Sequence, residues 1–177
     1  MEDASSGPTG CASHRAPAIR RFENMEIEVR RIAETEIDQL MALYPHLHAD
    51  DVPPDAAKLR ETWREICRNP DIAYFGAFVD GRMVSTCWIA AMPNLTRGCG
   101  RQAYLENVVT HPDFRGKGCG KAVVRHAVEY AWSRGCYKVM LLTGRKTDAV
   151  FNFYRSLGFS RDEKQAFILR KGRNDGK

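Results

Sequence analysis

The sequence lacks a long apolar segment, a paired-cysteine motif and a complete nucleotide-binding motif. No apolar run approaches the roughly 20 residues that span a bilayer, and residues 1–24 lack the continuous apolar stretch of a secretory signal. The six cysteines include no Cys-x-x-Cys pair, which argues against a zinc or redox site. We therefore expect free thiols, no metal, no membrane association and a cytoplasmic location.

The net charge of +5 is modest for 177 residues, and no aromatic-interleaved nucleic-acid motif accompanies it. The basic residues near a glycine-rich stretch gather around one position instead of forming a long stripe. They are Arg97, Arg101, Arg115, Lys117, Lys121 and Arg125. This distribution favours a small polyanionic ligand over a nucleic acid.

Composition divides the chain into a leader, one domain and a short tail. Residues 1–24 are rich in Ser, Gly, Pro, Ala and Arg and show no hydrophobic period, which predicts a disordered leader. Residues 25–171 carry the periodic segments and are long enough for one domain with a sizeable core. Residues 172–177 are expected to be a disordered tail.

Hydrophobic periodicity and turn residues predict the elements of this domain. Asp80-Gly81 between two apolar runs is a strong signal for a hairpin. We expect helices at 34–44, 55–67, 118–134 and 148–156. We expect strands at 25–31, 73–79, 83–91, 103–109, 137–142, near Phe159 and at 165–170. The helix that joins strand 103–109 to strand 137–142 implies a parallel pair, so the fold is α/β (α+β) with a mixed sheet.

The stretch Arg115-Gly116-Lys117-Gly118-Cys119-Gly120, named here the glycine turn, lies between a predicted strand and a predicted helix. Backbone N–H groups that converge at a helix start suit a phosphate. A Walker A loop requires a glycine where Arg115 stands and a Ser or Thr where Ala122 stands. Gly116, Gly118 and Gly120 also have the wrong spacing for a dinucleotide fingerprint.

The pattern that does fit is R-x-x-G-x-G, formed by Arg115, Gly118 and Gly120, and here the chain resembles the GNAT superfamily of N-acetyltransferases. Three further segments resemble that superfamily in the same order, and they are residues 106–112, 135–139 and 153–159. The resemblance covers about residues 25 to 171. It implies a mostly antiparallel, twisted sheet with a central splayed parallel strand pair and about four flanking helices.

The resemblance also implies transfer of an acetyl group from acetyl-CoA to a primary amine, by direct attack in a ternary complex. The amides of the glycine turn would hold the CoA pyrophosphate, and the edge of the preceding strand would pair with the pantetheine arm. The expected CoA-binding residues are Val108, Val109, Thr110, Arg115, Gly116, Lys117, Gly118, Cys119, Gly120 and Lys121.

Three further residues are candidates for the chemistry. Glu106 is a carboxylate in an otherwise apolar strand and is the expected general base, although an exposed strand-edge Glu is the alternative. Asn107 is expected to hydrogen-bond the substrate. Tyr154 matches the superfamily's tyrosine that donates a proton to the CoA sulfur, and the alternative is a tyrosine of the core.

The acceptor amine stays open. Within the superfamily, residues 103–159 are most similar to glucosamine-6-phosphate N-acetyltransferases, but Asn107 stands where those enzymes have an acidic residue. Amino acids, aminoglycosides and protein amines are the other acceptor classes. A catalytically inactive acyl-CoA-binding sensor is the alternative function. Members of the superfamily often form dimers, so a homodimer is also considered.

Overall fold

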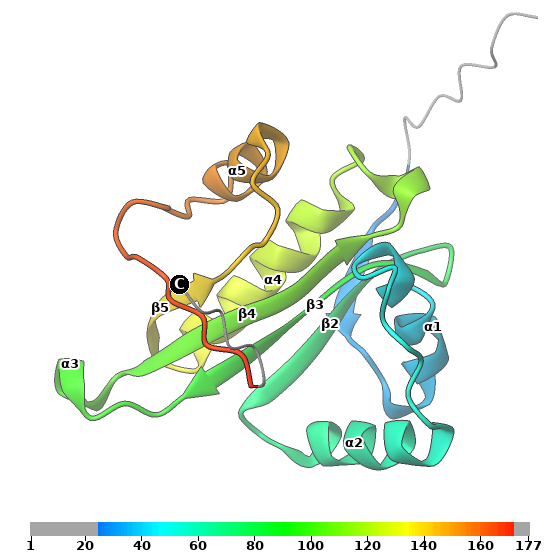
Figure 1. Ribbon diagram of the computed structural model, residues 1–177, viewed down its shortest axis with the longest axis horizontal. Helices are drawn as coiled ribbons and strands as arrows, with labels where there is room; N and C mark the ends of the chain where they lie inside the picture. The colour runs from blue at the N-terminus through cyan, green and yellow to red at the C-terminus, as the bar shows by residue number, and fades with distance from the viewer. Residues whose placement is uncertain (1–24, 172–177) are drawn as a thin grey trace, which may run out of the picture.

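A five-stranded sheet runs through the molecule, with helices on both of its faces (Figure 1). The computed structural model describes residues 25–171, so the expected leader and tail lie outside the described residues. The strands follow one another across the sheet in chain order. They are β1 (Glu28–Arg31), β2 (Ile72–Val79), β3 (Arg82–Met92), β4 (Arg101–Thr110) and β5 (Cys136–Leu141).

Only the pair β4–β5 is parallel, and the other three neighbouring pairs are antiparallel. This confirms the mixed, mostly antiparallel sheet. At the β2–β3 hairpin, Asp80 (φ 50°) and Gly81 (φ 74°) both adopt the left-handed conformation. Two left-handed residues form the type of tight turn that matches the twist of the flanking strands, so the Asp-Gly signal correctly located the hairpin.

One face of the sheet is covered by α4 (Cys119–Ser133). The buried side chains of α4 lie at helical spacing and pack on β2, β3 and β4; they are Cys119, Val123, Val124, Ala127 and Ala131. The helix begins after Gly118, which has a φ of 88°, and it ends before Gly135, which has a φ of 74°. Both glycines occupy conformations that side chains disfavour, which explains why the sequence marks these boundaries.

The other face is covered by α1 (Ile37–Met41) and α2 (Ala56–Arg68), which enclose a second apolar cluster with Phe78, Met83 and Val109. Asp55 caps α2 by accepting hydrogen bonds from the N–H groups of Ala57 (2.9 Å) and Lys58 (3.0 Å). Among the described residues, no helix is long and apolar enough to cross a membrane.

Three expectations about the elements require correction. The helix expected over residues 34–44 is divided into a 3₁₀ turn (Glu34–Glu36), α1 and a second 3₁₀ turn (Tyr44–His46) that contains Pro45. The loop after β3 contains the short α3 (Thr96–Cys99), whose Arg97 and Gly98 have left-handed dihedrals.

The expected strands near Phe159 and at residues 165–170 are wrong, because residues 156–171 form no strand. Phe167 and Leu169 are 91% and 97% exposed, so their apolar side chains face no neighbouring layer. A strand needs a neighbour for its N–H and C=O groups, and this segment has none within residues 25–171. The helix before it, α5 (Asp148–Arg155), follows β5 as expected.

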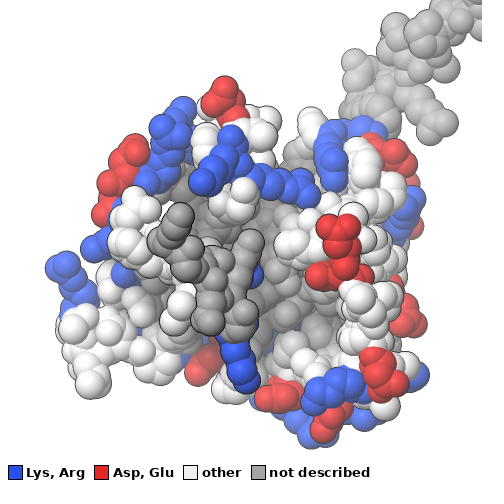
Figure 2. All heavy atoms as spheres, viewed as in Figure 1, with Lys and Arg blue, Asp and Glu red and all other residues white. Residues whose placement is uncertain are grey.

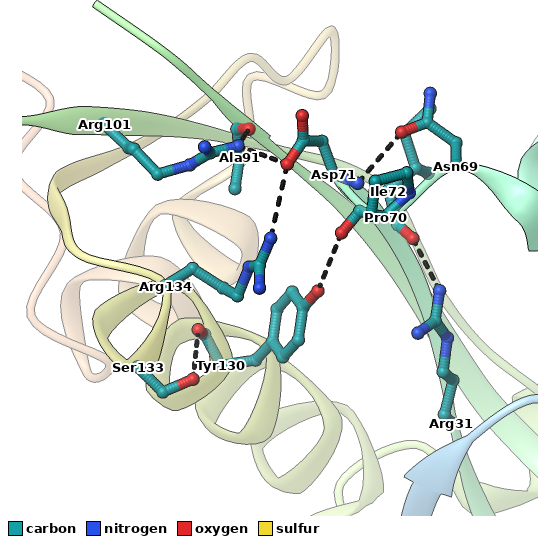
Figure 3. A network of polar contacts seen from close by, with 10 residues as sticks. All are labelled: Arg31, Asn69, Pro70, Asp71, Ile72, Ala91, Arg101, Tyr130, Ser133 and Arg134. Atoms are coloured by element: carbon teal, nitrogen blue, oxygen red, sulfur yellow. Dashed lines mark hydrogen bonds and ion pairs between the residues drawn. The ribbon is translucent and has the colours of Figure 1, made fainter.

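A polar network fixes the end of the sheet where β4 begins (Figure 3). The guanidinium of Arg101 donates to the carboxylate of Asp71 and to the carbonyl oxygen of Ala91. Arg134, at the end of α4, lies 3.4 Å from the same carboxylate. Asp71 directly precedes β2, so this network connects β2, β3, β4 and the C-terminal end of α4.

Candidate active site

The parallel strands β4 and β5 pair over only part of their length. Their register begins at Arg101↔Cys136 and ends at Leu105↔Leu141. β4 continues to Thr110, whereas the chain leaves β5 after Leu141 and turns toward α5. The edge of β4 from Glu106 to Thr110 therefore faces no strand on this side, which is the splayed pair that the resemblance implies.

A cleft of about 520 Å³ opens where the two strands separate. Its walls come from five parts of the chain: β4, Arg115 of the glycine turn, the loop after β5, α5 and the segment His46–His48. It is lined by His46, Leu47, His48, Leu105, Glu106, Asn107, Val108, Val109, Thr110, Arg115, Leu142, Thr143, Gly144, Arg145, Val150, Phe153 and Tyr154. Glu106, Asn107 and Tyr154, the three residues proposed for the chemistry, all lie on its walls.

A β-bulge interrupts β4 beside the cleft. Trp88 of β3 pairs with Glu106 and Thr86 pairs with Val109, so β4 has one residue more than β3 between these pairs. Asn107 lies within this interval and has a φ of 52°. A left-handed residue in a bulge changes the direction of the backbone and of the neighbouring side chains. The sequence analysis did not foresee this bulge.

Tyr154 reaches the cleft from α5. Its ring contacts those of Phe153 and Phe159 edge-on, with centroid distances of 5.0 and 6.0 Å. Burial, followed by the nearby Cys87 and Glu106, raises the pKa of Tyr154 to about 12. The hydroxyl therefore keeps its proton at neutral pH, and it lies on the same cleft as the Glu106 carboxylate.

The glycine turn lies beyond the end of β4. Arg115 donates from Nε to the carbonyl oxygen of Thr110 (3.1 Å), and it is the residue of the turn that lines the cleft. Gly116 and Gly118 have φ values of 75° and 88°, and Gly118, the N-cap residue of α4, has no side chain that could cap the N–H groups at the start of the helix. Those N–H groups carry the positive end of the helix dipole.

Two other residues of this region have structural roles. A Cβ atom on Gly120 would lie 2.9 Å from Oγ1 of Thr110, so the glycine lets α4 approach the end of β4 closely. Cys119 is fully buried, and burial raises the pKa of its thiol. A buried, protonated thiol is inert, as expected for a residue that does not carry the acyl group.

Several basic groups lie on or near the wall of the cleft that contains His46–His48. Arg145 donates to the carbonyl oxygens of His46 and Leu47, at 3.3 and 3.4 Å. The ring of His46 meets that of His111 edge-on at 4.8 Å, and Nη2 of Arg82 lies 3.0 Å from Nε2 of His111. Figure 2 shows several Lys and Arg side chains at the top of the view, in the region where α5 lies in Figure 1.

Comparison with known proteins assigns the chain to a family. Residues 37–159 match the Acetyltransferase (GNAT) family, and this range includes the cleft, the bulge and the glycine turn. The chain belongs to the GNAT acetyltransferase family. The resemblance drawn from the sequence motifs is therefore confirmed.

Relatives of this GNAT acetyltransferase cover most of its length. It is 31% identical over 143 residues to a glucosamine 6-phosphate N-acetyltransferase of Trypanosoma brucei brucei, covering 80% of this chain and 94% of the relative. A solved structure from Agrobacterium tumefaciens str. C58, named as an acetyltransferase, shares 38% identity with a TM-score of 0.77. That alignment covers 81% of this chain and 99% of the other.

A second solved structure, an aminoglycoside N-acetyltransferase in complex with CoA, has 20% identity and a TM-score of 0.70. That alignment covers 85% of this chain and 99% of the other. At this identity, the likeness concerns the fold. GNAT acetyltransferases use acetyl-CoA, and a CoA complex is found among the structural neighbours.

The structure of this GNAT acetyltransferase adds residues that the sequence analysis missed. Burial, followed by the neighbouring Glu106 carboxylate, raises the pKa of Tyr104 to about 12. Trp88 lies directly across from Glu106 on β3. The period of two along a strand places Tyr104 and Glu106 on one face, so this partner could have been found from the sequence.

Proposed function

We propose that this enzyme transfers the acetyl group of acetyl-CoA to a primary amine of a small molecule, by direct attack within a ternary complex. The observation that carries the proposal is the cleft between β4 and β5, because Glu106 and Tyr154 lie on its walls. A thioester and an amine brought together there would meet both a carboxylate and a protonated phenol.

The residues around the glycine turn suit the CoA moiety. The uncapped N–H groups that begin α4 offer donors to a pyrophosphate, and the nearby Arg115, Lys117 and Lys121 add positive charge. The backbone of Val108, Val109 and Thr110 lies where β4 faces no strand, so it can hydrogen-bond the amide groups of the pantetheine arm.

Each chemical step has a candidate group on this chain. Glu106 takes a proton from the ammonium form of the acceptor, directly or through a water molecule, so that the free amine can attack the thioester carbonyl. The N–H of Val108 donates to the oxyanion, a contribution of about 3 kcal/mol for one well-placed donor. The C–N bond forms, the C–S bond breaks, and the second proton of the amine passes to the departing sulfur, to which Tyr154 donates a hydrogen bond.

We propose that the acceptor carries an anionic group as well as an amine, and that an amino-sugar phosphate is the first acceptor to test. The support comes from His46, His48 and Arg145 on the cleft wall and from the T. brucei brucei relative, whose name specifies glucosamine 6-phosphate. Asn107 hydrogen-bonds the acceptor in this proposal.

Release of the CoA thiol tests the proposed function. The assay combines acetyl-CoA with glucosamine 6-phosphate, glucosamine, an aminoglycoside, free amino acids and a lysine peptide in turn. Turnover on one of these amines that falls sharply in Glu106→Gln supports the enzyme. Thermal stabilisation by acetyl-CoA without turnover on any amine would support the sensor instead, and absence of stabilisation would contradict both.

The cellular location and the oligomeric state stay predictions. Five cysteines within the described residues are free, which favours a reducing compartment such as the cytoplasm. The exposed side chains of Phe167, Ile168 and Leu169 offer an apolar segment that a second copy would cover in a homodimer. Light scattering on the wild type and on a Phe167→Ser variant measures whether this segment supports a dimer.

A further inference from the structure

Three residues form a row across the middle of the sheet. Tyr74 of β2 pairs with Trp88 of β3, and Trp88 pairs in turn with Glu106 of β4. Residues directly opposite each other on antiparallel strands point to the same face, with their Cβ atoms about 4.5–5.5 Å apart. The proposed base is therefore the direct cross-strand neighbour of a tryptophan side chain.

The buried residues beside this row show which face of the sheet it occupies. Ile89 and Leu105 pair across β3 and β4, are 0% and 1% exposed, and pack in the cluster that α4 covers. Since successive side chains of a strand alternate between faces, Trp88, Tyr104 and Glu106 lie on the opposite face. All three are only partly buried. Trp88 and Tyr104 belong to neither apolar cluster of residues 25–171, so core packing does not account for these two aromatic rings.

The Trp88 indole ring is covered from the β2 side. Tyr74 stacks on it with a centroid distance of 5.8 Å and an interplanar angle of 14°. An edge-on contact with Trp63 of α2, at 5.3 Å, holds the Tyr74 ring in turn. Within residues 25–171, Trp88 has no further ring contact and no Lys or Arg over its ring. On the β4 side, its neighbour in register is the Glu106 carboxylate.

Both groups on that side attract a cation. The face of an aromatic ring carries partial negative charge, and tryptophan attracts cations more strongly than tyrosine or phenylalanine. In the part of the chain that the structure describes, no Lys, Arg or His forms an ion pair with Glu106. A ring face beside a carboxylate without a cationic partner favours a positive group between them. A primary amine is such a group, because it is mostly protonated at neutral pH.

We propose that Trp88 binds the ammonium group of the acceptor, which is held between the indole face and the Glu106 carboxylate with the Tyr104 ring beside it. Glu106 lines the cleft and Trp88 lies on the neighbouring strand, so the acceptor extends from the cleft over β4. Trp88 thus favours acceptors that are cationic in solution. This inference rests on the proposed function, because the amine held here is the acceptor of that reaction.

Trp88→Leu removes the ring face and keeps a bulky apolar side chain. Loss of the cation–π contact should raise the KM of the acceptor about 5- to 30-fold. The attacking nitrogen regains positive charge as the C–N bond forms, so the ring stabilises the bound amine and the transition state alike. We therefore expect kcat, and the KM of acetyl-CoA, to change less than about threefold. Trp132→Leu, at a 48% exposed tryptophan of α4, is the matched control and should leave all three values unchanged.

A series of fluorinated tryptophans at position 88 separates the electrostatic role from packing. Each added fluorine withdraws electron density from the ring face and changes its shape little, so the KM of the acceptor should rise stepwise along the series. A ring that acts only through packing would give the same KM throughout. An acceptor KM that is unchanged across the series, or in Trp88→Leu, would overturn the proposal.

Calorimetric binding distinguishes this inference from the proposed function. The amines of the activity assay are titrated, with CoA present, into the wild type, Trp88→Leu and Trp132→Leu. At least one amine should bind the wild type and Trp132→Leu equally, and bind Trp88→Leu about 5- to 30-fold more weakly. If this pattern occurs in a protein that acetylates none of these amines, the proposed function fails and the ammonium site stands. Equal binding to all three proteins, or no binding of any amine, contradicts the site, even if acetyl transfer is observed.

Discussion

Replacement of Tyr154 by Phe tests the step in which the thiolate leaves. The phenylalanine keeps the ring that contacts Phe153 and Phe159 and removes only the hydroxyl, so the fold should be preserved. Because Tyr154 has a pKa of about 12, its hydroxyl keeps its proton at every pH at which the enzyme would be assayed. The question is how much of the rate that hydroxyl supplies.

The raised pKa sets the size of the expected effect. An ordinary thiol has a pKa of about 8.5, so full proton transfer from a phenol with a pKa near 12 is uphill by about 5 kcal/mol. Tyr154 should therefore act as a hydrogen-bond donor to the developing thiolate rather than as a complete proton donor. A hydrogen bond to a charged group contributes about 1.5–3 kcal/mol, which corresponds to about a 10- to 160-fold decrease in kcat.

Single-turnover release of the CoA thiol measures this decrease at saturating amine. The KM for acetyl-CoA should change little. Because the phenol stays protonated up to about pH 12, Tyr154 itself causes no loss of activity below that pH, so the wild type and Tyr154→Phe should lose activity at the same high pH. A fluorinated tyrosine at position 154 provides a matched control because it keeps the donor and lowers its pKa. An unchanged kcat in Tyr154→Phe, or an equal loss with the fluorinated residue, would refute the reasoning.

Three further variants test the base, the glycine turn and the sheet. Glu106→Gln should lower kcat by about 10²- to 10⁴-fold while acetyl-CoA still stabilises the protein against heat, and an unaffected kcat would exclude Glu106 as the base. Gly118→Ala places a side chain at a φ of 88°, so the melting temperature should fall by about 2–8 °C, and acetyl-CoA should stabilise the variant less than the wild type. Asp71→Asn weakens the pairing with Arg101 and should destabilise the protein by about 1.5–3 kcal/mol in urea unfolding, whereas Glu61→Gln, in an exposed pair, should be neutral.

Local chemistry explains which parts of the fold could be predicted. The Asp80-Gly81 hairpin and the two ends of α4 depend on residues that adopt left-handed backbone at low cost, and these residues are visible in the sequence. The period of α4 likewise follows from the one face that it buries. Such features require no knowledge of what lies elsewhere in the chain.

Features that depend on distant partners were not predictable in the same way. The apolar residues at 165–170 have strand-like composition, but a strand forms only where another strand offers its backbone groups. The bulge at Asn107 arises from the register between β3 and β4, and no local signal at position 107 announces it.

The candidate site divides in the same manner. The glycine turn and Tyr154 came from motif spacing, and Glu106 came from its place in an otherwise apolar strand. The structure places Glu106 and Tyr154 on one cleft. Their proposed roles stay predictions until the variants are measured. What the motifs could not supply is the surrounding geometry, namely the bend of the backbone at Asn107 that follows Glu106.

The position of a residue along β4 should determine what its substitution changes. At its first residue, Arg101, the strand is bonded to Asp71 and pairs with β5, so substitutions there should lower the free energy of unfolding. From Glu106 onward, β4 has no strand on the β5 side, and its direction depends on the bulge. Fewer backbone partners make this half less important for stability and leave its edge free for ligands, so substitutions there should change turnover more than the melting temperature.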